Sequence, residues 1–200
     1  MADEERFAQI VSIGAHDLST PLATVYGFAK TLAKTDLEEP AARYVEMIEA
    51  ASAQLRDLVD ELSLVTRIER GRYAPALTEA DSLELAREAC AELIERVAVS
   101  GEGAAVQVDP EATSRALSRL AKAASRHGGI ESVTLVVRGP ELEISPLLKN
   151  AAGVVTGEEL RELGAVVAVE HLKAIGVEVT AEDERLLIRF PGEPIFSGST

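Results

Sequence analysis

Apolar residues recur at helical spacing in two long N-terminal stretches of the chain. In the first, from about residue 4 to residue 35, they step by three, four or seven positions: Phe7, Val11, Leu18, Leu22, Val25, Phe28 and Leu32. In the second, from about residue 41 to residue 70, they alternate by four and three, as in a heptad repeat: Tyr44, Ile48, Ala51, Leu55, Leu58, Leu62 and Val65. The segment TDLEEP separates the two stretches, and Gly71 and Pro75 end the second. The pattern predicts two helices of about 30 residues in an antiparallel hairpin.

A hairpin of this kind has one apolar seam and little of its own chain to cover it. A second copy of the same hairpin, related by a two-fold axis, covers the seam and gives a four-helix bundle. The sequence therefore predicts a homodimer.

After Pro75 the predicted elements become shorter and mixed in type. Helices are expected over residues 81–98, 111–127 and 156–176, and strands over 104–109, 132–139 and 141–147, with a hairpin over 177–190. Helices on one side of antiparallel strands predict a small two-layer α/β sandwich. The fold class is therefore α+β, with a helical hairpin over residues 1–72 and a second domain over residues 73–200.

Composition and charge restrict the classes of binding partner and the cellular compartment that we expect for this protein. The chain is 46% hydrophobic and carries a formal net charge of −14, which argues against nucleic-acid and anionic-membrane partners because these need clustered Lys and Arg. The one cysteine, Cys90, excludes an intrachain disulfide and sits on the apolar side of its predicted helix, so it is expected in the core. No apolar run approaches the roughly 20 residues of a membrane span, and the polar, acidic N-terminus does not read as a signal peptide. We expect a cytoplasmic protein.

The segment HDLSTP, in the middle of the first predicted helix, carries candidate chemistry. His16 lies roughly 200° around the helix from the seam residue Leu18, and Thr20 is one turn further on the same face as His16. Pro21 leaves the carbonyl of Asp17 without its helical partner and bends the helix. These residue types suit phosphoryl transfer. The imidazole can attack phosphorus, the carboxylate can hold or accept the imidazole proton, and the hydroxyl can position a water molecule. The alternative, an ordinary surface histidine, leaves the mid-helix proline unexplained.

The string HDLSTPL, with a helix on each side and a second heptad helix after it, resembles the phosphoacceptor box of sensor histidine kinases. The resemblance implies His16 as phosphoacceptor and Asp17 as its acid/base neighbour. Thr20 stands where members with phosphatase activity place Thr or Asn, and Pro21 shapes the site. Ser19 is a departure, because an Arg is common at that position.

The second half resembles the ATP-binding domain of the same kinases, without its nucleotide chemistry. Arg119 and Ala123 stand where working kinases carry Asn residues that ligate Mg²⁺. The stretch ELEISPLLKNAAGVV has no Asp-x-Gly-x-Gly loop, the lid segment is short, and only Gly164 remains of the glycines that lead the last helix. Phosphate approach needs glycine and Mg²⁺ needs oxygen ligands, so the resemblance is to a degenerate ATPase domain.

A phosphoacceptor without an ATP site resembles the dimeric histidine phosphotransferases. This implies a two-component phosphorelay in which His16 moves a phosphoryl group between aspartates of response-regulator receiver domains. Mg²⁺ is then supplied by the receiver, and the chain itself binds no cofactor and no metal. Two alternatives stay open: a non-catalytic dimeric pseudokinase or adaptor module, and a response-regulator phosphatase that uses Asp17 and Thr20. An ATP-driven kinase is the least favoured reading.

Two further features carry weaker indications. Basic residues step along one face of the predicted helix over 111–127, either as a solvated face or as a contact for an acidic partner: Arg115, Arg119, Lys122 and Arg126. His127 and His171 lack acidic or cysteine neighbours at metal-ligand spacing, so no metal site is expected.

Overall fold

The computed structural model describes residues 2–32, 40–69, 71–93 and 96–191. The side chains of two predicted site residues, His16 and Ser19, lie outside the described part, as does the turn at 33–39 between the two long helices. The chain divides into two compact units, Met1–Leu64 and Val65–Thr200, against an expected division at residue 72.

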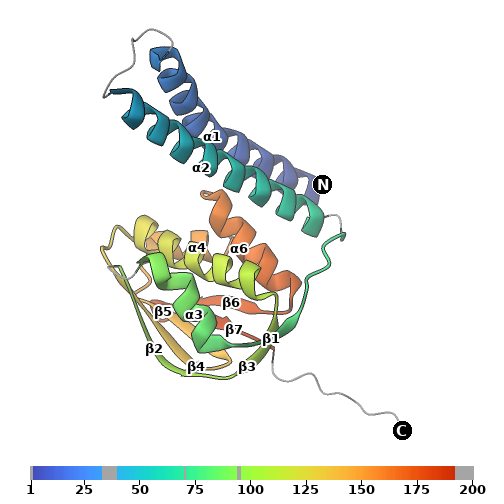
Figure 1. Ribbon diagram of the computed structural model, residues 1–200. Helices are drawn as coiled ribbons and strands as arrows, with labels where there is room; N and C mark the ends of the chain where they lie inside the picture. Colours follow the sequence, from blue (N-terminus) through green and yellow to red (C-terminus); the bar gives the residue numbers. More distant parts are fainter. Residues whose placement is uncertain (1, 33–39, 70, 94–95, 192–200) are drawn as a thin grey trace. The chain divides into compact units, whose positions relative to one another are not determined.

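The N-terminal unit is built from two long helices that run side by side in opposite directions (Figure 1). Helix α1 spans Ala2–Leu32, and α2 spans Pro40–Glu69. Near the connecting turn, the rings of Phe28 and Tyr44 lie 5.5 Å apart, which joins the end of α1 to the start of α2. Pro40 is compatible with a first helical turn, where its missing N–H costs no hydrogen bond. The predicted helical hairpin is confirmed.

The second unit contains five-stranded and two-stranded sheets together with shorter helices. Its helical segments are α3 (Ser82–Cys90), the 3-10 turn η1 (Ala91–Leu93), α4 (Pro110–Gly128), α5 (Lys149–Val155) and α6 (Leu163–Ala174). Its strands are β1 (Thr78–Asp81), β2 (Val97–Gly103), β3 (Ala105–Val108), β4 (Val133–Gly139), β5 (Glu141–Ser145), β6 (Glu178–Glu182) and β7 (Arg185–Arg189).

The main sheet has the strand order β2-β4-β5-β7-β6, and β1 pairs with β3 in a small separate sheet. β2 runs parallel to β4, and the remaining neighbours are antiparallel. Helices α3, α4 and α6 lie on one face of the main sheet (Figure 1), and the aliphatic core fills the space between the two layers. Cys90 is part of this core, as expected. The predicted two-layer α+β domain is confirmed.

Local signals set the ends of α4. The Asp109 carboxylate accepts a hydrogen bond from the Ala112 N–H at 3.2 Å, and Pro110 occupies the first turn. At the other end Gly129 adopts the left-handed conformation, with φ 67°, which glycine reaches without the penalty of a Cβ atom. The expected helix over 111–127 therefore forms almost residue for residue.

For two of the helices, the predicted position of one end was wrong. The helix expected over 81–98 stops at Cys90, and Val97 instead opens β2, where parallel pairing with β4 buries it. The helix expected over 156–176 begins only at Leu163, because the chain turns at Gly157, whose φ is 76°. The preceding residues form α5, which the periodicity did not reveal.

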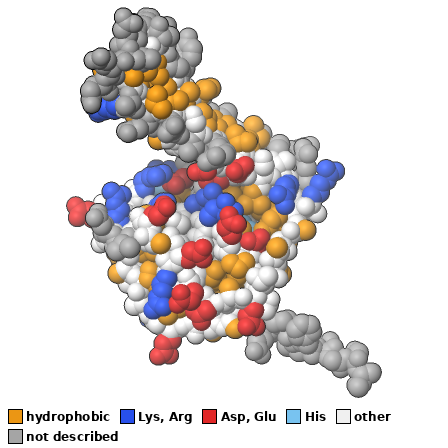
Figure 2. Space-filling model, viewed as in Figure 1, with side chains coloured by type: hydrophobic (Ala, Val, Ile, Leu, Met, Phe, Trp, Pro, Cys, Tyr) orange, Lys and Arg blue, Asp and Glu red, His pale blue; other side chains and the backbone are white. Residues whose placement is uncertain are grey.

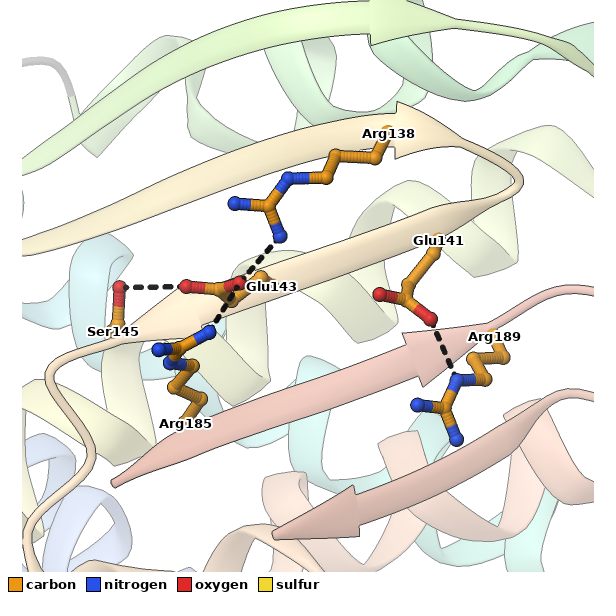
Figure 3. A network of polar contacts seen from close by, with 6 residues as sticks. All are labelled: Arg138, Glu141, Glu143, Ser145, Arg185 and Arg189. Atoms are coloured by element: carbon orange, nitrogen blue, oxygen red, sulfur yellow. Dashed lines mark hydrogen bonds and ion pairs between the residues drawn. The ribbon is translucent and has the colours of Figure 1, made fainter. Parts of the chain in front are cut away.

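The sheet face turned away from the helices carries an ion-pair network (Figure 3). Along β5, Leu142 and Ile144 face the core, so the acidic residues between them alternate to the opposite side. Glu143 is only 6% exposed and accepts from Arg138 of β4 at 2.7 Å and from Arg185 of β7 at 3.5 Å. The network therefore ties three adjacent strands together on this face.

None of the described helices combines the length and the apolarity that a membrane span requires.

Candidate functional site

The HDLSTP segment lies within α1, which continues as a helix through Pro21. Residues 16 and 20 are one turn apart on this helix and so share a face, as predicted. Thr20 is exposed, Asp17 is half-buried and Pro21 is buried. The helix therefore presents the Thr20 hydroxyl to solvent one turn after the position of His16.

Two features can bend α1 at and just after Pro21. Pro21 has no N–H to donate to the carbonyl of Asp17, which normally weakens a helix at that turn. One turn later the Thr24 hydroxyl donates to the Thr20 carbonyl at 3.1 Å, and further along the helix the Thr31 hydroxyl donates to the Gly27 carbonyl at 2.9 Å. Hydroxyl bonds from a threonine to the carbonyl four residues earlier favour local bending of a helix.

In the C-terminal domain, Arg119 and Ala123, the two positions where the resemblance to kinases led us to expect nucleotide-site asparagines, lie on α4. Ala123 is fully buried in the core, and Arg119 is half-buried. A methyl group offers no oxygen to a metal ion, and a guanidinium offers only donors. Neither side chain can ligate Mg²⁺.

The segment between β5 and α6 uses its glycines for its own packing. A Cβ on Gly153 would lie 2.8 Å from the Glu159 side chain, and one on Gly157 would lie 3.2 Å from Val169. The room that these glycines leave is thus taken up by neighbouring side chains of the same chain. Val154 and Val155 are fully buried beside them.

Three polar contacts fasten the end of α4 to this segment and to α6. His127 Nε2 lies 2.7 Å from a carboxylate oxygen of Glu162, and Arg126 pairs with the other oxygen at 3.2 Å. Asn150 donates from its side-chain amide to the His127 carbonyl at 2.6 Å. The contact of His127 with Glu162 was not predicted from the sequence, because the two residues are 35 positions apart.

A second histidine, His171 on α6, is buried, and it also has partners that sequence reasoning missed. Its Nδ1 lies 2.9 Å from the Tyr73 hydroxyl and its Nε2 lies 3.4 Å from the Thr113 hydroxyl. Burial lowers the pKa of His171 to about 4, against a smaller raising effect of the Asp109 carboxylate. Tyr73 is 98 positions from His171 in sequence, so no local sequence pattern predicts this cluster.

Metal-ligand geometry does not occur among the residues that the structure describes. No group of three or more His, Cys, Asp or Glu in that part of the chain is arranged to hold an ion. His127 and His171 are both engaged with protein partners instead.

Comparison with known families identifies the helical hairpin. Residues 8–71 match the His Kinase A (phospho-acceptor) domain, a range that contains the whole HDLSTP segment. The hairpin is similar to His Kinase A domains over this range. Sequence comparison with curated proteins gives no significant match for the chain.

Solved structures resemble the chain in fold. An Acinetobacter baumannii histidine kinase, AdeS, matches with a TM-score of 0.59 and 13% identity, covering 86% of this chain and 94% of that one. The ATP-binding domain of PrrB from Mycobacterium tuberculosis matches with a TM-score of 0.49 and 19% identity over 58% of this chain and 98% of that one. A bacterial phosphotransferase matches with a TM-score of 0.45 and 13% identity over 90% and 93% of the two chains. The chain therefore shares its fold with the histidine kinase AdeS, and its hairpin matches the phospho-acceptor family.

Proposed function

We propose that this protein is a phosphorelay histidine phosphotransferase that does not use ATP. His16 takes a phosphoryl group from an aspartate of one receiver domain and passes it to an aspartate of another. One observation carries the proposal: a hairpin similar to His Kinase A domains is joined to an ATPase-like domain whose nucleotide-site positions serve the packing of the domain itself.

The residues of the second domain do not fit a Mg²⁺–nucleotide complex. The donor set on α4 is wrong, because Ala123 and Arg119 supply no ligand oxygen. Nearby hydroxyls are also engaged: Thr113 faces His171 at 3.4 Å, and Ser114 donates to Glu88 at 3.2 Å. The segment that follows β5 is held by its own contacts rather than left open around a ligand. Phosphoryl groups must then come from a donor other than ATP.

The proposed phosphoryl transfer follows from the residue types of the HDLSTP segment. A neutral imidazole nitrogen of His16 attacks the phosphorus of an aspartyl phosphate, a P–N bond forms, and the P–O bond to the aspartate breaks. The aspartate leaves as a carboxylate, and Asp17 holds or accepts the proton of the other imidazole nitrogen. The reverse transfer returns the group to a second receiver. The receiver brings the Mg²⁺ that neutralises the phosphoryl oxygens.

Exposed apolar side chains on the hairpin support a homodimer. Leu22 on α1 is 57% exposed and Val59 on α2 is 50% exposed, and Val11 and Val45 are exposed as well. Hydrophobic side chains follow the described part of the hairpin in Figure 2. A second hairpin packed on this face buries them in a four-helix bundle. Leu22→Glu and Val59→Glu should convert the dimer to a monomer in sedimentation velocity. Ala50→Glu is the control for general effects of an added charge, because Ala50 is exposed and lies roughly 180° around α2 from Val59.

The decisive experiment offers the protein two donors in parallel. Receiver domains phosphorylated with acetyl phosphate and then freed of it are one donor, and ATP with Mg²⁺ is the other. We expect acid-labile, base-stable phosphate on the chain from a receiver, none from ATP, and none on His16→Gln from either. His127→Gln is the matched control, since it removes a histidine but keeps the box, and it should still be phosphorylated. Labelling from ATP overturns the proposal.

A phosphatase of phosphorylated receivers is the second candidate, favoured by the exposed Thr20 one turn after His16. It predicts that Thr20→Ala abolishes receiver dephosphorylation while His16 is still phosphorylated. Tight receiver binding without phosphoryl exchange in either direction would instead identify a non-catalytic adaptor.

A further inference from the structure

A cleft of about 510 Å³ opens beside the second half of α4, in a part of the C-terminal domain that the proposed phosphotransfer does not use. Its walls come from η1, from the start of β2, from α4 and from the turn after α4. The lining residues are Leu93, Arg96, Val97, Ala121, Lys122, Ser125, Arg126, Gly129 and Ile130. The volume lies in the range of small-molecule sites, which usually measure about 300–1,000 Å³.

The cleft is not formed by the side of α4 that contacts His171. Thr113 faces His171 of α6, and Lys122 follows nine residues later, which is roughly 180° around the helix. Lys122 therefore points away from the contact between Thr113 and α6.

The chain fixes the shape of the cleft without a ligand. Val133 donates its backbone N–H to the Arg96 carbonyl at 2.9 Å, which holds the start of β2. Beyond α4, the Ile130 N–H donates to the Ser125 carbonyl at 3.1 Å, and the Ser125 hydroxyl donates back to the Ile130 carbonyl at 2.6 Å. A wall held in this way loses little conformational entropy when a ligand binds.

The walls combine an apolar floor with a cationic rim. Val97 and Ala121 are buried, and Ile130 packs against the core. Arg96 and Lys122 are exposed at the rim. A ligand with an apolar body and a charged end matches these two surfaces.

Two of the three cations at the rim make no ion pair among the described residues, namely Arg96 and Lys122. Arginines of the main sheet are paired, for example Arg138 with Glu143 at 2.7 Å and Arg189 with Glu141 at 2.6 Å. Arg126, the third cation of the rim, pairs with Glu162 at 3.2 Å, and Glu131 lines an adjoining pocket together with Arg96. In a chain of net charge −14, two unpaired cations at one cleft produce a local positive potential.

We infer that this cleft binds a small organic anion, in which a phosphate or carboxylate group is attached to an apolar body. The anionic group lies between Arg96 and Lys122, where a guanidinium fork and an ammonium both donate charge-assisted hydrogen bonds. The apolar body covers Val97, Ala121 and Ile130. The concave shape and the volume of about 510 Å³ favour a small molecule over a flat protein partner.

Titration of the 200-residue chain with phenyl phosphate and with benzoate tests this inference. Ligand-observed NMR gives the dissociation constants, with inorganic phosphate and benzyl alcohol as probes of the anion alone and the ring alone. We expect one or both aromatic anions to bind at least tenfold more tightly than either half-ligand, and the tighter of the two identifies the charged group. Binding should weaken as salt is raised.

Charge-reversal variants locate the site. Arg96→Glu and Lys122→Glu should each weaken binding at least tenfold, whereas Lys173→Glu, the same change on α6 at a residue already paired with Glu170, should leave it unchanged. All three side chains are exposed, so far-UV circular dichroism should match that of the parent protein. Equal losses in all three variants, no loss in Lys122→Glu, or no binding of either anion overturns the inference. Phosphate uptake from a receiver should be normal in Lys122→Glu, which keeps this test independent of the proposed relay.

Discussion

The buried imidazole of His171 should make the stability of this protein fall as the pH drops from neutrality toward 5.5. Desolvation by burial lowers its pKa from 6.5 to about 4; Asp109 acts in the opposite direction, and Arg119 and Arg115 act in the same direction. The unfolded chain therefore binds a proton below pH 6.5, while the folded chain keeps the ring neutral down to about pH 4. The stabilisation is fully present above pH 6.5 and is lost as the pH falls through this window.

The size of the effect follows from the two pKa values. A lowering from 6.5 to about 4 corresponds to roughly 3 kcal/mol when the pH has passed below both values, at about 1.4 kcal/mol per pKa unit. At pH 5.5, one unit below the unfolded pKa, the loss is about 1.4 kcal/mol. This pH stays above the isoelectric point of about 4.7, where solubility is lowest. Domains are typically stable by about 5–15 kcal/mol, so the change is measurable.

Urea unfolding of the parent protein and His171→Gln at pH 7.5 and pH 5.5 measures the effect. Glutamine does not titrate, so the difference between the two proteins cancels the contribution of the many carboxylates. We expect the parent to lose about 1.4 kcal/mol more than His171→Gln over this range. Tyr73→Phe removes one hydrogen-bond partner of the ring, at a cost of about 1 kcal/mol at pH 7.5, but keeps the burial. The same pH dependence in the parent and in His171→Gln, or an NMR titration of His171 near pH 6.5, would refute the reasoning.

Three further predictions concern the C-terminal domain. Gly101→Ala should destabilise the domain by about 3 kcal/mol or more, because φ is 117° and a Cβ would collide with the Val137 carbonyl. Gly129→Ala is the control: φ is 67° and the space around it is open, so the cost should be about 1 kcal/mol. Thermal unfolding measures both. Cys90, whose pKa is raised by burial to about 11, should not react with a thiol reagent at pH 8 until the domain is unfolded, and fast native-state labelling would contradict this. Asp109→Ala removes the cap of α4 and should cost about 1 kcal/mol, with Asp109→Asn keeping most of that stability.

Much of the fold could be predicted because its signals are local. The two long helices follow from periodic apolar residues, and α4 follows from Asp109–Pro110 at its start and Gly129 just beyond its end. The hairpin of β6 and β7 was also predicted, and its turn places Asp183 and Glu184 at positive φ. Each of these elements is specified by residues within a few positions of its own ends.

The errors arose where distant pairing overrides local preference. Val97 and Ala98 continue a helical pattern, yet their strand pairs in parallel with Val133 and Thr134, more than 30 positions along the chain. Likewise β1 becomes a strand only because β3 lies beside it. Such pairings leave no periodic signature in either segment alone.

The candidate sites also differ in whether nearby or distant residues of the sequence form them. Positions 16 to 21 form one turn and a half of a single helix, so the sequence alone predicts their shared surface. The cluster of Tyr73, Thr113 and His171 draws on three separate segments, and only the fold brings them together. The cationic cleft beside α4 is similar, since Arg96 and Lys122 meet there from different elements.

The phosphate donor of His16 is the most direct test of the account. Intact and peptide mass spectrometry at alkaline pH would follow the chain after incubation with phosphorylated receiver domains and, separately, with ATP and Mg²⁺. The account predicts phosphate on His16 from a receiver, none from ATP, and return of the group when an unphosphorylated receiver is added. Phosphate on His16 from ATP, or no phosphate from any receiver, would contradict it.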